Sequence, residues 1–514
     1  MAVQDFLARS AERFPAKIAA ICGDRRISYR DLDQQSGALA LGLIQLGVRK
    51  GDRVALLLET SIELVLGIFA TLKAGASFVI VAPELKPERA HTLIEDSGAR
   101  VLVSRESDAL RYASVPSIVR CVVVGPPSAG GVPESFHRFS ALATREESGV
   151  ELPIVEAEAL AALIYTSGST GRSKGVMLSH RNIEFASASI LEYLQRRADD
   201  VFLDLLPLSF DYGLYNLLMP IRLGATVVLE RGFLVPAQVG GVVRREKVTV
   251  LPLLPPLIAL LLAYARGSAS EWTEVECVTS TGQPLGAHHA EGLARLFPRA
   301  RVFSMYGLTE CKRATYLPPE ELHRRPTSVG KAIPGTRVHL MDERGAPIHE
   351  PGVEGELWVE GPHVMQGYWG QPEASAAVLL PSERPGERIL RTGDRFVRDE
   401  AGFLYFVGRR DDLIKTAGER VSLYEVERVV GAMPGVRELA VYAVPHEILG
   451  QVIEVALVLE AEASLDESGV LSHCRELLEK VKVPRRVRFL DALPRTATGK
   501  IDVRALQETG ELRP

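Results

Sequence analysis

The sequence YTSGSTGRSKG occupies residues 165–175 and directly follows the apolar run Ala161–Ile164. Two glycines, Gly168 and Gly171, let the backbone approach an anion closely, and successive amide N–H groups can cradle phosphate oxygens. Hydroxyl side chains add donors, and Lys174 adds a positive charge. The spacing departs from GxxxxGK[ST], which excludes the ordinary nucleoside triphosphatase loop. Taken alone, the segment predicts either a phosphate-binding loop or a flexible surface turn.

Helical and strand patterns alternate on both sides of this segment, with Gly- and Pro-containing turns between them. This alternation is typical of a parallel α/β sheet. Before the segment the pattern predicts helices over Ser36–Leu46 and Ile62–Lys73 and strands over Arg53–Leu58 and Phe78–Val81. After it, the pattern predicts buried strands over Val201–Leu206, Thr226–Leu229, Thr249–Leu253, Glu276–Ser280 and Arg301–Ser304.

The pattern changes after about residue 335, where short strands are joined by Gly-, Pro- and Asp-rich turns. Strands over Val338–Met341, Gly355–Val359 and Phe403–Val407 indicate an antiparallel subdomain. A charged stretch follows, and beyond it the pattern is compact α+β. It predicts helices over Leu423–Ala432 and Ser468–Glu479 and strands over Glu438–Val444 and Val452–Leu459. We therefore expect one domain over residues 1–410 and a second over residues 411–514.

The bulk properties exclude several classes of function. A chain of 514 residues is long enough for two or three domains and a large core. Its formal net charge of -5 gives no basic excess for binding nucleic acid. The apolar stretches Leu64–Ala82 and Leu251–Ala265 are interrupted by Lys73 and by three prolines, respectively, so neither is expected to span a membrane.

The five cysteines are widely scattered, with no CxxC pair and no zinc-ligand spacing, which predicts free thiols in a reducing compartment. The N-terminal residues 1–21 carry charges throughout and do not resemble a signal peptide. These features predict a cytoplasmic protein.

Five further motifs follow the glycine-rich segment along the chain and favour its interpretation as a phosphate-binding loop. The sequence YGLTE occupies residues 306–310, GEL 355–357, RTGD 391–394, GRRDDLIK 408–415 with Gly418, and PRTATGK 494–500. Together with the glycine-rich segment, they resemble the ordered motifs of the adenylate-forming superfamily. This superfamily comprises acyl-CoA synthetases, luciferases and the adenylation domains of peptide synthetases. The resemblance covers essentially the whole chain.

The resemblance implies a fold and a reaction. The expected fold is α/β, with a large N-terminal domain of two doubly wound subdomains and an antiparallel β subdomain, followed by a small mobile α+β C-terminal domain. Family members use ATP and Mg²⁺ to convert a carboxylate to an acyl-AMP, and they then transfer the acyl group to a thiol. Such a step depends mainly on positioning and charge neutralisation.

The resemblance also implies the residues that bind ATP. Asp394 is expected to accept the ribose hydroxyls, Arg409 to assist there, and Tyr306 to stack on adenine beside the backbone of Gly282 and Gln283. The phosphates are expected to contact Thr309 and the phosphate loop, whose residues are Thr166, Ser167, Gly168, Ser169, Thr170, Gly171 and Lys174.

Lys500 resembles the family's catalytic lysine and Glu310 its magnesium-binding glutamate. Magnesium bound through one carboxylate and the phosphates suits the chemistry of this hard cation. Asp411 matches the hinge residue about which the small domain rotates between the two half-reactions. After that rotation, the face carrying Lys415 and Gly418 is expected to meet the thiol.

The substrate is indicated by the stretch LPLSFDYG at residues 206–213. Many acyl-CoA ligases have an aromatic–histidine pair where this chain has Phe210 and Asp211, which is similar to amino-acid-activating domains. There the aspartate pairs with the substrate ammonium, because a buried carboxylate needs a cationic partner. An aspartate that caps the following helix is the alternative. The expected pocket lining is Asp211, Tyr212, Tyr215, Leu253, Thr279, Ser280, Thr281, Met305, Arg313 and Ala314.

The bulky Tyr212, Tyr215 and Met305 favour a small substrate. The run TECKR at residues 309–313 resembles stand-alone adenylation enzymes of macrolactam antibiotic pathways, which load β-amino acids onto discrete carrier proteins. If Arg313 points inward with Ser280, it could hold a second carboxylate, as in members that activate 3-methylaspartate. Alternatively, Arg313 points to solvent or pairs with a neighbour.

Three functions are therefore weighed. The first is a β-amino-acid adenylation enzyme that loads a separate carrier protein, since the chain has no phosphopantetheine-attachment motif. The second is an AMP-forming acyl-CoA synthetase for a small acid, with coenzyme A as the acceptor and Asp211 in a structural role. A non-enzymatic nucleotide sensor is the third, and Lys500, Glu310 and Asp394 argue against it.

Overall fold

The computed structural model describes residues 1–126, 133, 135–144, 151–166, 173–230, 235–265, 272–282, 285, 287–409, 413–416, 419–446, 450–461, 463–495 and 501–508. The chain forms two compact units. The first comprises residues 1–338 and 359–391, and the second comprises residues 339–358 and 392–514. The domain boundary at residue 410 stays a prediction, because residues 410–412 lie outside the described residues.

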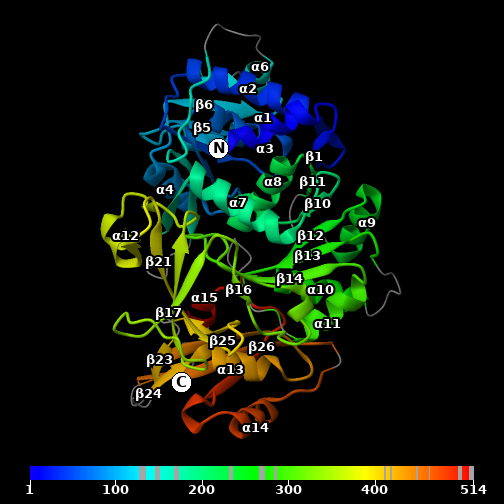
Figure 1. The fold of residues 1–514 in the computed structure, drawn as a ribbon, viewed down its shortest axis with the longest axis vertical. Coiled ribbons are helices and arrows are strands. Elements are labelled where there is room, and N and C mark those ends of the chain that lie inside the picture. The colour runs from blue at the N-terminus through cyan, green and yellow to red at the C-terminus, as the bar shows by residue number, and fades with distance from the viewer. Residues whose placement is uncertain are drawn as a thin grey trace. The chain divides into compact units, whose positions relative to one another are not determined.

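The first unit contains an eight-stranded sheet with the order β19-β9-β8-β4-β3-β5-β6-β7. Strands β5 and β6 of this sheet are labelled in Figure 1. The central strands β8, β4, β3, β5 and β6 run parallel, whereas β9 is antiparallel to both β8 and β19. The strands are β3 (Arg53–Leu57), β4 (Ser77–Ile80), β5 (Val101–Arg105), β6 (Arg120–Val124), β7 (Phe136–Arg138), β8 (Leu160–Thr166), β9 (Lys174–Ser179) and β19 (Gly367–Tyr368).

The second sheet of this unit has nine strands in the order β16-β15-β14-β13-β12-β10-β11-β1-β2. Strands β14, β13, β12, β10, β11 and β1 are parallel, so their carboxyl ends lie at one edge. The strands are β1 (Ile18–Cys22), β2 (Arg25–Ser28), β10 (Val201–Asp204), β11 (Thr226–Leu229), β12 (Val250–Leu253), β13 (Cys277–Ser280), β14 (Arg301–Tyr306), β15 (Thr315–Leu317) and β16 (Lys331–Ala332).

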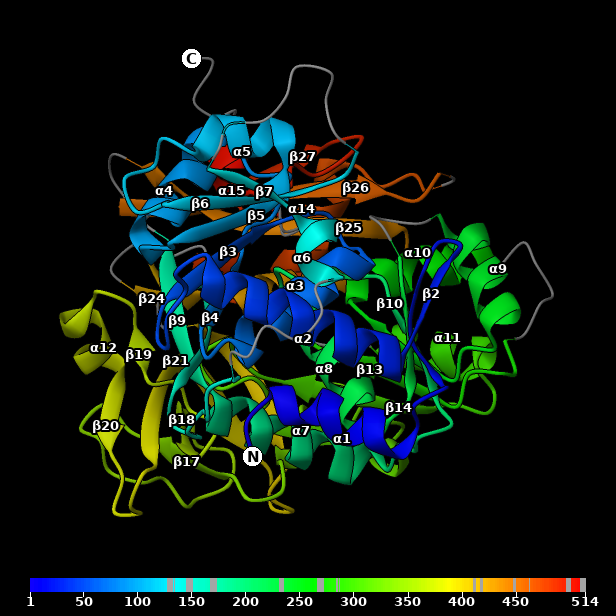
Figure 2. The same ribbon diagram turned by 90° about the horizontal axis from the view of Figure 1, so that it is seen from above.

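Helices cover these sheets because their apolar side chains face inward. Helix α3 is buried along its whole length, and α2 packs against it, as Figure 2 shows. The helices of this unit are α1 (Gln4–Arg13), α2 (Tyr29–Gln45), α3 (Ile62–Lys73), α4 (Pro87–Ser97), α5 (Glu106–Tyr112), α6 (Phe139–Ala143), α7 (His180–Leu194), α8 (Asp211–Leu223), α9 (Pro236–Glu246), α10 (Pro255–Ala265), α11 (Ala287–Leu296) and α12 (Pro372–Val378), with the 3₁₀ turn η1 (Pro319–Glu321).

A third sheet has the order β17-β18-β21-β20, with β22 beside β21. Strand β21 is antiparallel to both β20 and β22. The strands are β17 (Arg337–Met341), β18 (Gly355–Gly361), β20 (Leu379–Pro381), β21 (Arg388–Arg398) and β22 (Leu404–Arg409).

The C-terminal part of the second unit is a sheet with the order β24-β23-β26-β25, with β27 parallel to β26. Val426 of α13 and Val470 of α14 belong to the apolar core beneath it. The elements are β23 (Leu413–Thr416), β24 (Glu419–Ser422), α13 (Leu423–Gly431), β25 (Val436–His446), β26 (Gly450–Leu459), α14 (Glu467–Leu477), η3 (Lys480–Lys482), β27 (Arg486–Phe489) and α15 (Val503–Glu508).

The expected α/β fold class is confirmed: a large N-terminal part of several sheets precedes a small C-terminal part of one sheet and helices. All five cysteines are buried, and none of them forms a disulfide in the described structure. Among the helices that the structure describes, none combines the length and apolar character needed to cross a membrane.

Candidate active site

The glycine-rich segment begins and ends at two paired strands. Thr166 closes β8, Lys174 opens β9, and these two residues are direct partners in the antiparallel ladder. The ladder therefore fixes both ends of the loop side by side. The loop residues themselves lie outside the described residues, and these include the predicted phosphate ligands Ser167, Gly168, Ser169, Thr170 and Gly171.

Strand β19 brings Tyr368 to the start of β9. Tyr368 pairs with Val176, and the Lys174 ammonium lies 4.7 Å from the centre of the Tyr368 ring. The Tyr368 hydroxyl donates a hydrogen bond of 2.8 Å to Oε1 of Glu310. Burial and the Glu310 carboxylate together raise the pKa of that hydroxyl far above its ordinary value. The structure thus places the predicted phosphate lysine and the predicted magnesium ligand on either side of one tyrosine.

Glu310 suits a magnesium ion that is otherwise held by phosphates. It is a partly exposed carboxylate in the turn after β14, and its backbone carbonyl accepts a hydrogen bond from the amide of Met365. Within the described part of the chain, no three acidic, histidine or cysteine side chains gather as a metal cluster. A single carboxylate is enough for magnesium, which keeps several waters and takes phosphate oxygens.

The loop after β14 folds back tightly on itself. The amide of Ala314 donates to the Tyr306 carbonyl at 2.9 Å, which closes residues 306–314 into a ring. A Cβ at Gly307 would lie 1.9 Å from the carbonyl oxygen of Lys312, so no side chain fits there. The absence of a Cβ at Gly307 is what lets Lys312 and Arg313 turn inward behind Tyr306, Thr309 and Glu310.

Asp211 is buried and paired with a lysine of the same chain. It is the first residue of α8, and Phe210 at the N-cap makes no capping bond through its side chain. The Lys312 ammonium lies 3.0 Å from Oδ2 of Asp211 and 2.6 Å from its carbonyl oxygen. It also lies 4.1 Å from the centre of the Tyr215 ring. Burial lowers the pKa of Lys312 to about 7, and the Asp211 carboxylate opposes that shift.

Arg313 points inward and carries an uncompensated charge. Its side chain is 3% exposed, and its guanidinium carbon lies 4.6 Å from the centre of the Tyr212 ring. One guanidinium nitrogen donates to the Lys312 carbonyl, but Nε has no hydrogen-bond partner, and within the described part of the chain Arg313 forms no ion pair. The buried hydroxyl of Ser280 likewise lacks a partner. A buried cation without a counter-ion favours an anionic ligand.

These residues meet at the carboxyl edge of the second sheet. Ser280 ends β13, Tyr306 ends β14, and Asp211 opens the helix that follows β10. Ligands of open α/β sheets bind outside this edge. The Tyr212 hydroxyl donates a hydrogen bond of 2.9 Å to the carbonyl of Thr279 in β13, which holds Tyr212 against this edge. Gly282 follows with φ +90°, which glycine adopts readily.

In the second unit, Asp394 and Arg409 are cross-strand partners of β21 and β22. Asp394 is buried, and its Oδ1 lies 3.2 Å from the Nε of the largely exposed Arg409. Its backbone amide donates to the Thr392 hydroxyl, and the preceding Gly393 has φ +73°. The structure brings together the two residues predicted to contact the ribose.

Several predicted residues lie outside the described residues. They are Gln283, the hinge residue Asp411, Gly418 and the catalytic Lys500. The backbone of Lys415 lies in β23, paired with Arg420, and its side chain is not described. The segment that contains Lys500 is bracketed by a β-bridge between Arg495 and Ile501.

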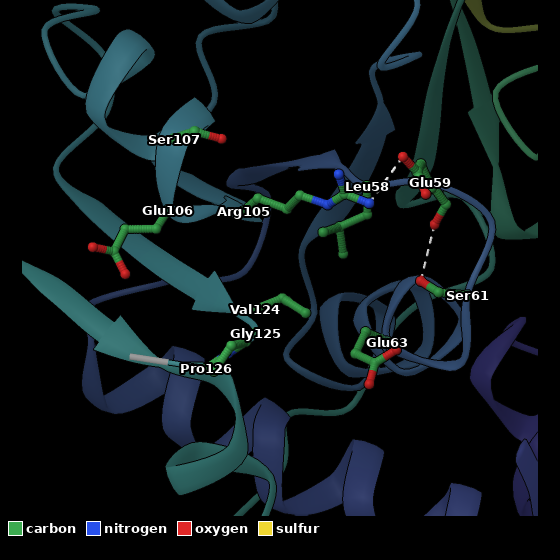
Figure 3. A pocket seen from close by; sticks show the side chains of 10 residues that line it. All are labelled: Leu58, Glu59, Ser61, Glu63, Arg105, Glu106, Ser107, Val124, Gly125 and Pro126. Carbon is green, nitrogen blue, oxygen red and sulfur yellow. Dashed lines mark hydrogen bonds and ion pairs between the residues drawn. The ribbon is translucent and has the colours of Figure 1, made fainter. Parts of the chain in front are cut away.

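A separate pocket of about 360 Å³ lies at the carboxyl ends of β3, β5 and β6 (Figure 3). Its charges are already paired: Arg105 lies 2.8 Å from Glu59, and Glu106 lies 3.2 Å from Arg138. None of the predicted site residues lines it.

Two residues of the site were missed by sequence reasoning. Lys312 lies inside the TECKR run, but only the structure shows that it faces Asp211. Tyr368 lies in the run QGYWG at residues 366–370, where an aromatic residue after glycine was the available signal.

Glu310, Tyr306 and Asp211 at the carboxyl edge of the second sheet, with the glycine-rich segment held between β8 and β9, match the arrangement expected of ligases that form an acyl-adenylate. The chain belongs to the AMP-binding enzyme family: the family model matches residues 7–369, and the model of the family's C-terminal domain matches residues 425–500. It is an AMP-forming acid–thiol ligase that uses ATP and magnesium.

Its relatives act on different acids. The chain is 32% identical to an indoleacetate–CoA ligase of Aromatoleum aromaticum, with 98% of each chain covered. It is 28% identical to part of a linear gramicidin synthase of Brevibacillus parabrevis, over 97% of this chain and 9% of that protein. The chain thus resembles both a free-standing CoA ligase and a segment of a peptide synthetase.

Solved structures share the whole fold. The anthranilate CoA ligase AuaEII with bound anthranoyl-AMP superimposes with a TM-score of 0.88 at 27% identity, covering 100% of this chain and 98% of that one. The o-succinylbenzoate CoA synthetase of Bacillus subtilis with ATP and magnesium gives a TM-score of 0.83 at 29% identity, over 98% and 99% of the chains.

Proposed function

We propose that this enzyme activates a small acidic β-amino acid as its aminoacyl-AMP and transfers it to the phosphopantetheine thiol of a separate carrier protein. The observation that carries the proposal is the buried guanidinium of Arg313, which has no counter-ion among the described residues and lies over the ring of Tyr212, the residue that follows Asp211. A substrate with a second carboxylate and an ammonium complements both charges. The bulky, buried side chains of Tyr212 and Tyr215 favour a small substrate.

The reaction forms a bond between a carboxylate oxygen and the α-phosphorus as the bond to pyrophosphate breaks. Lys174 and the phosphate loop hold the phosphates, and Glu310 holds magnesium, which neutralises charge on the leaving group. Lys500 stabilises the charge that develops between the carboxylate and the α-phosphate. Asp394 and Arg409 hold the ribose, and Tyr306, Gly282 and Gln283 hold adenine.

After adenylation, the small domain is proposed to rotate about Asp411 and present Lys415 and Gly418 to the thiol. The carrier protein is the favoured acceptor because the TECKR run resembles carrier-loading enzymes of antibiotic pathways. Five cysteines that form no disulfide among the described residues are in keeping with a cytoplasmic enzyme.

A second candidate is an acyl-CoA synthetase for a small carboxylic acid. The Lys312–Asp211 pair favours it, because Asp211 already has an ammonium partner within the chain. On this alternative, Asp211 is structural and coenzyme A takes the acyl group.

ATP–pyrophosphate exchange separates the two candidates. The proposed function predicts exchange with aspartate and 3-methylaspartate above succinate and propionate, and loss of the amino-acid activity in D211N. Exchange with propionate alone would establish the second candidate. Mass spectrometry of the thioester, with a carrier protein and coenzyme A supplied together, then identifies the acceptor.

A further inference from the structure

Lys312 holds an uncommon backbone conformation inside the pocket. Its φ is +60°, in the left-handed region that non-glycine residues seldom occupy. Such a conformation persists when the surroundings enforce it, and it is often found at functional sites. Here the tight loop around Gly307 enforces it, and the result is that a lysine ammonium reaches the start of α8.

The Lys312 ammonium lies where a substrate ammonium would be expected. It contacts both the carboxylate and the carbonyl oxygen of Asp211, and Tyr215 covers it with its ring face. Carboxylate and aromatic faces are also the groups that recognise ligand ammonium ions. Lys312 thus makes the contacts that an amino substrate would need.

The charges of the pocket do not balance without a ligand. Asp211 offsets Lys312, and Arg313 forms no ion pair among the residues that the structure describes. The buried carboxyl of Asp204 also interacts with Lys312, but burial raises its pKa well above the ordinary value, which favours its neutral form. A distal carboxylate on the substrate balances Arg313 whether or not the substrate carries an amine. Whether the enzyme prefers a substrate with an amine then depends on how readily the substrate ammonium displaces Lys312 from the Asp211 carboxylate.

We propose that Lys312 sets the selectivity of the pocket between ammonium-bearing and amine-free acids, by competing with the substrate ammonium for the Asp211 carboxylate. The inference rests on the proposed function, because it takes the ligand to be a small acid with a distal carboxylate. Lys312 is accordingly a specificity-determining residue, with no part in the phosphoryl chemistry.

The test compares aspartate with succinate, which lacks only the amine, in ATP–pyrophosphate exchange. In K312M the Asp211 carboxylate loses its ion pair with the Lys312 ammonium, so the ratio of kcat/KM for aspartate to that for succinate should rise about tenfold or more. The change should come from a lower KM for aspartate, with the KM for ATP unaltered. An unchanged ratio in folded K312M would overturn the proposal.

A matched control is available in the same unit. Lys73 is 8% exposed and lies 2.7 Å from Oδ1 of Asp33 and 2.6 Å from its carbonyl oxygen, so it repeats the contacts of Lys312 away from the pocket. K73M removes a buried lysine of the same kind, and the substrate ratio should stay within about twofold of wild type. A shift as large as that of K312M would show that the effect is general destabilisation and overturn the proposal.

The double variant D211N/K312M covers the case in which K312M fails to fold, because it removes both members of the ion pair together. Its ratio should fall about tenfold or more below wild type, since the ammonium has lost its anchor. A wild-type ratio in this variant would contradict the inference. If the wild-type enzyme does not activate aspartate, the proposed function fails as well; if it activates aspartate and the ratio does not respond, only the role of Lys312 fails.

Discussion

At the scale of single residues, the pocket is defined by charges that burial makes costly. Asp211, Lys312 and Arg313 are each less than a tenth exposed. The sequence showed an aspartate at position 211 as a candidate substrate ligand. It also gave an inward-pointing Arg313 as one of two alternatives. The partner of Asp211 was not, because Lys312 is 101 residues away and the pairing depends on the path of the loop after β14.

Arg313 should be essential for acids with a second carboxylate. Replacing it with leucine removes the charge that binds the distal carboxylate, and kcat/KM for aspartate should fall at least about thirtyfold, on the order of 2 kcal/mol. Activation of β-alanine, which lacks that carboxylate, should change little. Exchange assays with both substrates check this, and an equal loss for the two would show that Arg313 has no role in recognition.

Tyr368 should support magnesium binding through Glu310. Y368F keeps the ring beside Lys174 but removes the hydroxyl that orients the Glu310 carboxylate. The magnesium concentration that gives half-maximal exchange should therefore rise about tenfold. Titrating the exchange rate with magnesium measures this. Y405F is the control, because it removes a hydroxyl bonded to Asp399 elsewhere; a matching shift there would count against the assignment.

At the scale of elements, seven strands of the two α/β sheets were predicted from apolar runs, and their bounds agree with the structure within two residues. They are β3, β4, β10, β11, β12, β13 and β14. Predicted Thr226–Leu229 is β11 unchanged, and predicted Thr249–Leu253 is β12 with one further residue at its start. The two-residue strand β19 was not predicted, because so short a segment has no periodicity and depends on pairing with β9, far away in sequence. That pairing positions Tyr368 beside Lys174 and Glu310.

The loop of residues 306–314 should tolerate no side chain at Gly307. G307A would push against the Lys312 carbonyl and lower the free energy of unfolding on the order of 3 kcal/mol, with loss of exchange activity. Thermal unfolding and the exchange assay measure both effects. G241A is the matched control, because nothing lies within 4 Å of its added Cβ. The substitution should slightly stabilise helix α9, since alanine has a higher helix propensity than glycine. Equal behaviour of the two variants would refute the tight-loop account.

At the scale of the whole molecule, the motif order predicted the fold class and the family. The division into units was harder to predict from the sequence, because residues 339–358 belong to the second unit although residues 359–391, which follow them, belong to the first. Contacts between segments far apart leave no local pattern, so the boundary near residue 410 was inferred from the change in strand pattern and from the motifs alone.

Lys500 should be required for adenylation and dispensable for ATP binding. K500A should lower the exchange rate at least about a hundredfold, because a preorganised charge at the reacting phosphate is lost. Calorimetry should find ATP affinity within about threefold of wild type. K480A, which removes an exposed lysine of the same unit, should leave both unchanged. Full exchange activity in K500A would rule out its catalytic role.

The most direct test of the proposed substrate is a crystal structure with the sulfamoyl-adenosine analogue of β-aspartyl-AMP. We expect the distal carboxylate to lie about 3 Å from the Arg313 guanidinium. The substrate ammonium should lie at a similar distance from Asp211, with the Lys312 side chain displaced. A distal carboxylate directed to solvent, with Arg313 still unpaired, would contradict this expectation.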